Sequence, residues 1–254
     1  MRMDGGTTPP ARIHHWGSMP PPATASAVAS EAKLSIGFIN WAHALDHYVM
    51  LIFPTVVISL EVVYAKTYAE LLALATASYI AFGIFSLPAG WLADRWSRRN
   101  MMAVFYAGCG LSLVAAGLAP NLVVLAVALT ALGLFAAIYH PVGTAMLIQH
   151  ATLRGRSLAF NGVCGNLGAA LAAGATAALV AGLGWRAAFL VPGVICVVTA
   201  VVYLRLVPEE KRREASRGTV ADVPLGVALV MLWPVASQSC GNGSPELPFQ
   251  SLSL

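Results

Sequence analysis

Six long apolar blocks separated by short polar breaks dominate the chain between residues 35 and 207. They lie near residues 35–60, 70–92, 101–119, 122–149, 157–181 and 186–207. Each is long enough to cross a hydrocarbon layer of about 30 Å as a helix, which takes roughly 18 residues or more. Backbone N–H and C=O groups in lipid must be satisfied within their own segment, which favours helices. The pattern predicts an all-α membrane protein with six transmembrane helices, a domain of residues 34–207.

The composition supports a lipid environment for most of the chain. Of its 254 residues, 58% are hydrophobic and 10% are charged, whereas a soluble domain usually carries about 25% charged residues. Breaks such as Pro120-Asn121 and Gly182-Leu183-Gly184 favour tight turns, so we expect consecutive helices to run antiparallel. The Lys and Arg residues are scattered between apolar blocks, which argues against a nucleic-acid partner.

The placement of basic residues predicts the orientation in the membrane. With the N-terminus in the cytoplasm, thirteen basic residues fall on cytoplasmic segments and only Lys66 and Arg186 on the other side. Cytoplasmic loops carry the excess of Lys and Arg. We therefore predict a multi-pass protein of the inner cell membrane with a cytoplasmic N-terminus. The cytoplasmic set is Arg2, Arg12, Lys33, Arg95, Arg98, Arg99, Arg154, Arg156, Arg205, Lys211, Arg212, Arg213 and Arg217.

The segments on either side of the six blocks differ from them in character. Residues 1–33 are rich in Pro, Ala, Ser and Gly, and we expect a disordered N-terminal tail. Residues 208–222 are expected to form a charged cytoplasmic linker. An apolar run over 223–236 is too short to span comfortably. We interpret residues 223–254 as a partial seventh helix followed by an irregular tail.

The sharpest motif joins the second and third blocks at residues 90–99. It reads Gly90-Trp91-Leu92-Ala93-Asp94-Arg95-Trp96-Ser97-Arg98-Arg99. This segment resembles the major facilitator superfamily signature, Gly-x-Leu-x-Asp-Arg-x-Gly-Arg-Arg, and departs from it only at Ser97. If that turn needs a positive φ, Ser would cost roughly 1 kcal/mol relative to Gly. A carboxylate at this helix end can pair with Arg98 or Arg99, or accept from a neighbouring helix N-terminus.

The resemblance carries expectations about the architecture. It implies two six-helix halves, each made of two inverted three-helix repeats, around a substrate site at the membrane midplane. This chain would supply one half, so a second six-helix half or a homodimer is an expected partner beside the lipid bilayer and a small-molecule substrate. The resemblance further implies a cytoplasmic gate that pairs partly with the other half. Its residues here are Gly90, Asp94, Arg95, Arg98 and Arg99.

The His and Asp side chains of the first block lie on one face of the expected helix. His43, Asp46 and His47 are spaced by three and four residues, so their side chains lie on the same side of a helix. A carboxylate in lipid is costly and should face a cavity or a partner. Substrate recognition or proton coupling is one interpretation, and a structural hydrogen-bond network is another. Two His and one Asp could also ligate zinc, but no further ligand is evident, so we predict no metal site and no cofactor.

The fourth block carries Tyr139-His140-Pro141. Pro141 removes one backbone hydrogen bond and should bend the helix. Because the first and fourth helices are equivalent in the two repeats, His140 is placed to reach across the cavity toward Asp46. The stretch loosely resembles the fosmidomycin-resistance exporter branch. Drug exporters of the superfamily often have an Arg in this helix, but residues 122–149 contain neither Arg nor Lys.

The fifth block has a face of small residues. Gly165, Gly168 and Ala172 lie on one side of the expected helix. Small residues allow close approach of a neighbouring helix in membranes. The block is similar to the glycine-rich fifth-helix motif of antiporters but lacks its proline, and we interpret the face as a packing surface.

These observations favour a secondary transporter of a small organic solute, acting by proton-coupled efflux. His43, Asp46, His47 and His140 are the candidate substrate and coupling residues. The alternative is a truncated, non-transporting six-helix remnant, or a half-transporter that needs a partner. A membrane enzyme is disfavoured because neither Gly-x-Ser-x-Gly nor His-Glu-x-x-His occurs.

Overall fold

The protein folds as a bundle of membrane-length helices. The computed structural model describes residues 25–209, and within them no strand is present. Six spans are long and apolar enough to cross a membrane, namely Ser30–Tyr64, Tyr68–Arg95, Arg98–Gly117, Leu122–His150, Arg154–Leu183 and Ala187–Leu206. They confirm the six predicted blocks. The elements are α1 (Ala25–Tyr64), α2 (Tyr68–Leu72), η1 (Ala73–Ala75), α3 (Thr76–Arg95), α4 (Arg98–Gly117), α5 (Leu122–Ala136), α6 (Tyr139–His150), α7 (Arg154–Leu183) and α8 (Ala187–Leu206).

The first helix begins earlier than expected. Residues 25–33 were assigned to a disordered tail, but they are the first turns of α1. The reason is local: the last proline of the leader is Pro22, and the following residues are rich in alanine, the strongest helix former. Residues 1–24 and 210–254, including most of the predicted linker and the partial seventh helix, lie outside the described residues.

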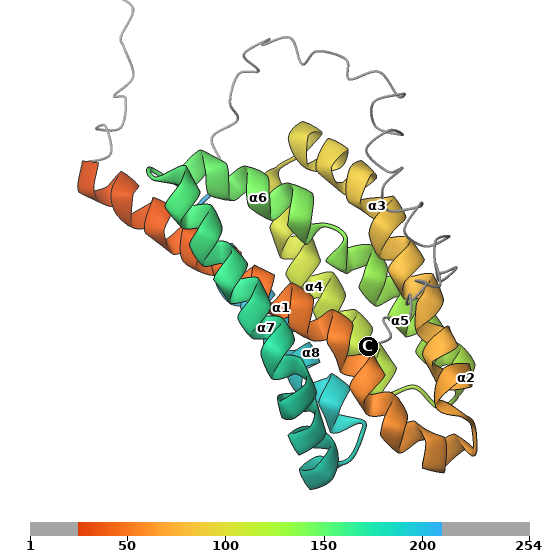
Figure 1. Cartoon of the computed structure of the whole chain (residues 1–254). Helices are drawn as coiled ribbons and strands as arrows, with labels where there is room; N and C mark the ends of the chain where they lie inside the picture. The colour runs from red at the N-terminus through yellow and green to blue at the C-terminus, as the bar shows by residue number, and fades with distance from the viewer. Residues whose placement is uncertain (1–24, 210–254) are drawn as a thin grey trace, which may run out of the picture. The chain divides into compact units, whose positions relative to one another are not determined.

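The most extensive helix packing in the bundle is between α1 and α7 and between α4 and its neighbours α5 and α8 (Figure 1). α7 runs along α1, and α4 lies against both α5 and α8. The apolar stretch of α4 is 67% buried, against 22% for that of α7. α4 is therefore the interior helix of the described residues, while the other spans leave large apolar side chains for lipid.

Small residues on α7 allow it to approach α1 closely. A Cβ on Gly168 would collide with the backbone carbonyl of Ala44, and Ala172 is buried. The predicted packing role of this face is confirmed. At the other end of α7, Gly184 has φ +84° and closes the predicted turn into α8.

The fourth span is interrupted in its middle. α5 ends at Ala136 and α6 begins at Tyr139, so the span consists of two helices. Pro141 has no N–H to donate to the carbonyl of Ala137, which explains why the regular hydrogen-bond ladder stops here. The predicted bend at Pro141 is confirmed, and it places His140 in the first turn of α6.

Candidate functional site

A buried carboxylate on α1 meets an imidazole on α6. Asp46 is 2% exposed, and its Oδ2 lies 3.3 Å from Nε2 of His140. Its other oxygen, Oδ1, is buried without a hydrogen-bond partner among the described residues. The two residues come from the first and fourth spans, which the family resemblance makes equivalent, and the expected reach of His140 toward Asp46 is confirmed.

Three imidazoles gather beside this pair. The ring centroids of His43 and His47 are 4.8 Å apart, and His140 lies 5.5 Å from the first and 5.8 Å from the second. One ring nitrogen from each of the three lies within 4.8 Å of the others. The structure thus brings all four predicted site residues into one cluster, made by adjacent turns of α1 and the start of α6.

A polar network on the α7 side holds the cluster in place. Nδ1 of His43 lies 2.8 Å from the backbone carbonyl of Asn161, which can only accept, so Nδ1 carries the proton. The buried side chain of Asn161 accepts from the Tyr139 hydroxyl at 3.1 Å and donates to Oδ1 of Asn40 at 2.9 Å. Tyr139 also stacks on His43, with ring centroids 4.9 Å apart.

The glycine face of α7 has a second role at this site. A Cβ on Gly165 would lie 2.6 Å from Nε2 of His43. The position therefore leaves the space that the His43 ring occupies, in addition to bringing two helices together. Sequence reasoning assigned no site role to Asn161, Tyr139 or Gly165. The available signal was the presence of polar side chains inside otherwise apolar blocks.

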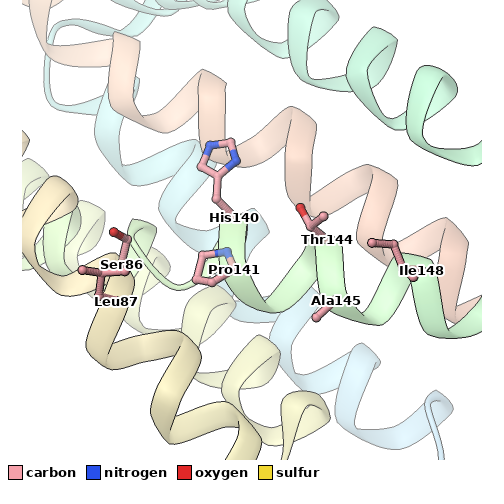
Figure 2. A pocket seen from close by; sticks show the side chains of 7 residues that line it. All are labelled: Ser86, Leu87, His140, Pro141, Thr144, Ala145 and Ile148. Carbon is pink, nitrogen blue, oxygen red and sulfur yellow. The ribbon is translucent and has the colours of Figure 1, made fainter. Parts of the chain in front are cut away.

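The imidazole of His140 also borders an open pocket of about 510 Å³ between α3 and α6. In Figure 2 the ring points toward the α1 ribbon, while Pro141 lies on the side of Ser86 and Leu87. The rest of the lining is the α6 face of Thr144, Ala145 and Ile148. The side chain of His140 is 44% exposed, so the described residues leave this edge of the cluster uncovered.

The loop motif forms an exposed ion pair. Arg98 Nη2 lies 2.8 Å from Oδ1 of Asp94, and Arg98 Nη1 donates to Oε1 of Gln149 at 3.1 Å. The guanidinium of Arg95 lies over the ring of Trp91, 3.9 Å from its centroid. Of the alternatives that the sequence left open for Asp94, namely Arg98, Arg99 or a neighbouring helix N-terminus, the structure shows the pair with Arg98, which also links the α3–α4 loop to the end of α6.

Two other residues of the motif have roles that the sequence did not predict. Arg99 is buried, and it donates to the backbone carbonyls of Val207 at 2.7 Å and Leu204 at 2.6 Å, at the end of α8. Ser97 has φ −170°, so the suspected cost of a positive φ does not arise. Its hydroxyl accepts from the backbone N–H of Asn100 at 3.2 Å and caps α4.

Six apolar spans around a partly buried polar cluster define a multi-pass membrane protein. The family model of the Major Facilitator Superfamily matches residues 36–247, and the chain belongs to this superfamily. It is 30% identical over 178 residues to puromycin resistance protein pur8 of Streptomyces alboniger. That alignment covers 67% of this chain and 35% of the relative, so the chain spans about a third of that protein's length. The family and this relative support a transporter rather than an enzyme.

Proposed function

We propose that this protein takes part in the export of a small organic solute, driven by exchange with protons. The superfamily supports transport, and the name of the puromycin resistance relative supports a drug-like solute moved outward. The observation that carries the coupling proposal is the Asp46–His140 pair at 3.3 Å, in which the carboxylate is buried within the spans.

The physical argument starts from the cost of a charge in the membrane interior. An ionised carboxylate there costs several kcal/mol unless a partner compensates it. Asp46 has one such partner, His140, and one oxygen without any among the described residues. Proton exchange at Asp46 changes the strength of a contact that joins the first and fourth spans. A rearrangement of these two spans is thereby linked to proton movement.

The export experiment uses puromycin as the probe, because the relative's name supplies it. The full chain is expressed in bacteria that lack their own drug exporters, and retained puromycin is measured. We expect lower retention than in cells with an empty vector, and loss of the difference with a protonophore. Asp46→Asn should abolish export without reducing membrane insertion. Glu61→Gln is the matched control, an acid-to-amide change on the same helix.

Two results would count against the proposal. Equal puromycin retention with and without correctly inserted chain contradicts export of this solute. Export by Asp46→Asn that still depends on the proton gradient removes Asp46 from the coupling mechanism.

We also propose that the exporting species contains a second six-helix half. In this superfamily the substrate site lies between two halves that move against each other, and the described spans correspond to one of them. The second half is a further part of the same polypeptide, a second copy or another chain. Light scattering of the purified full chain, with puromycin transport in liposomes, tests this. A six-span monomer that transports puromycin contradicts it.

The orientation with a cytoplasmic N-terminus and a cytoplasmic 93–100 loop is part of the proposal. It rests on the excess of basic residues on that side. Ser97→Cys, labelled in intact cells with a membrane-impermeant maleimide, should remain unmodified until the membrane is opened. Labelling of this cysteine from outside intact cells would contradict the proposed orientation.

A further inference from the structure

We propose that His43, His47 and His140 form a binding site for one divalent transition-metal ion of the zinc class. This inference goes beyond the proposed function, since binding does not require that the chain transports anything. The sequence offered two histidines and an aspartate on one turn, and lacked a further ligand. The fold supplies that ligand from α6, almost a hundred residues along the chain.

The spacing of the imidazoles suits a single ion. Their ligand nitrogens all lie within 4.8 Å of one another. Zinc–nitrogen bonds of about 2.0–2.1 Å in a tetrahedron place two nitrogens about 3.4 Å apart. Rotation of the His47 and His140 side chains would close this difference while His43 keeps its contact with the Asn161 carbonyl. Three imidazoles with one open position are a ligand set that zinc accepts.

The surroundings orient two of the rings as metal sites usually do. Metal-binding histidines generally donate their second ring N–H to a carboxylate or a backbone carbonyl. Here Nδ1 of His43 donates to the carbonyl of Asn161, and Nε2 of His140 faces the Asp46 carboxylate. These contacts leave Nε2 of His43 and Nδ1 of His140 as the nitrogens available for the ion.

The charge of Asp46 and the access to His140 also favour a bound cation. The buried Asp46 carboxylate has an oxygen without a hydrogen-bond partner among the described residues, and a nearby cation compensates such a charge. His140 opens on the pocket between α3 and α6, which gives an ion a route to the rings (Figure 2). Imidazole nitrogens select Zn²⁺, Ni²⁺, Co²⁺ or Cu²⁺ over Mg²⁺ and Ca²⁺, which prefer oxygen ligands.

The test uses the full chain without a histidine tag, purified in detergent. Titration with Co²⁺ should produce the visible absorption of a tetrahedral ion at one equivalent per chain, and Zn²⁺ should abolish it. His43→Gln, His47→Gln and His140→Gln should each weaken Zn²⁺ binding at least 10-fold. Asp46→Asn should weaken it 10- to 100-fold, as loss of an orienting partner does.

Two controls use the remaining histidines of the chain, His14, His15 and His150. His150→Gln, a change on α6 outside the cluster, should leave Zn²⁺ affinity unchanged. The double variant His14→Gln/His15→Gln should also bind one ion. Loss of binding in the double variant, or unchanged affinity in the three cluster variants, overturns the proposal.

A measurement on the unmodified chain keeps the test decisive if a variant fails to fold. X-ray absorption at the zinc edge should show imidazole nitrogens at about 2.0 Å. A sulfur ligand, or no bound zinc at all, overturns the site. The two proposals fail separately: puromycin retention reports export, whereas the titration reports binding in detergent, where no transport occurs.

Discussion

Two of the acid–base pairs among the described residues have similar lengths, but their carboxylates lie in opposite surroundings. Asp94 and Arg98 are 2.8 Å apart with the carboxylate side chain 62% exposed, whereas Asp46 and His140 are 3.3 Å apart with the carboxylate 2% exposed. An exposed pair contributes about 0–1 kcal/mol to stability, because water already solvates both groups. Where the carboxylate itself is buried, removal of its partner leaves an uncompensated charge. The environment therefore decides which of the two pairs the molecule depends on.

The largest expected effect is at the Asp46–His140 pair, whose carboxylate is buried. His140→Ala should lower the free energy of unfolding by about 3 kcal/mol, because Asp46 then remains buried without its partner. Denaturant titration in detergent micelles measures this. Adding Asp46→Asn should recover much of the loss, since the buried charge is removed as well. If His140→Ala lowered the free energy of unfolding by less than about 1 kcal/mol, the Asp46–His140 pair would contribute no more to stability than an exposed pair does.

The second prediction divides the loop motif. Arg99→Gln should cost about 2 kcal/mol, because its charged hydrogen bonds to the Val207 and Leu204 carbonyls are lost from a buried position. The same titration gives the value. Arg98→Gln, one residue away on the exposed side, is the matched control and should cost less than 1 kcal/mol. Equal costs would contradict the division of the motif into a buried and an exposed half.

The third prediction disturbs the histidine cluster without removing a polar group. Gly165→Ala places a methyl group against the His43 ring. Relative to Gly162→Ala on the same helix, where a Cβ meets nothing within 4 Å, it should cost about 1–2 kcal/mol. It should also weaken Zn²⁺ binding. Unchanged stability and Zn²⁺ affinity would show that the ring has room to move.

The smallest expected effect is at the exposed pair. A double-mutant cycle with Asp94→Asn and Arg98→Gln should give a coupling of about 0.2–1 kcal/mol. The coupling should shrink further between 0.05 and 1 M salt, because the screening length falls to roughly 3 Å. A coupling above 2 kcal/mol that ignores salt would mean that the pair is shielded from water.

The features that sequence predicted are those that depend on local pattern. Block length determines the six spans, and the short separation of Asp94 and Arg98 along the chain allows their contact across the α3–α4 turn. The contact between His140 and Asp46 was also expected, because the inverted repeats place the first and fourth helices opposite each other.

The features that it missed depend on how each helix is rotated about its axis. Nδ1 of His43 donates to the backbone carbonyl of Asn161, 118 positions along the chain. Nε of Arg99 donates to the carbonyl of Val207, 108 positions along the chain. Many residues of these helices are apolar, so the sequence pattern does not fix the face that each presents. The packing of the whole bundle decides which face of each helix points inward.

The interruption of the fourth span has a mechanical consequence. Ala136, Ala137 and Ile138 are buried, so the break lies in the protein interior, where irregular backbone is tolerated at membrane depth. α5 is packed on α4, whereas α6 carries His140 into its contact with α1. Because the regular backbone hydrogen-bond ladder is interrupted between α5 and α6, a tilt of α6 that withdrew His140 from Asp46 would not require α5 to leave its place on α4.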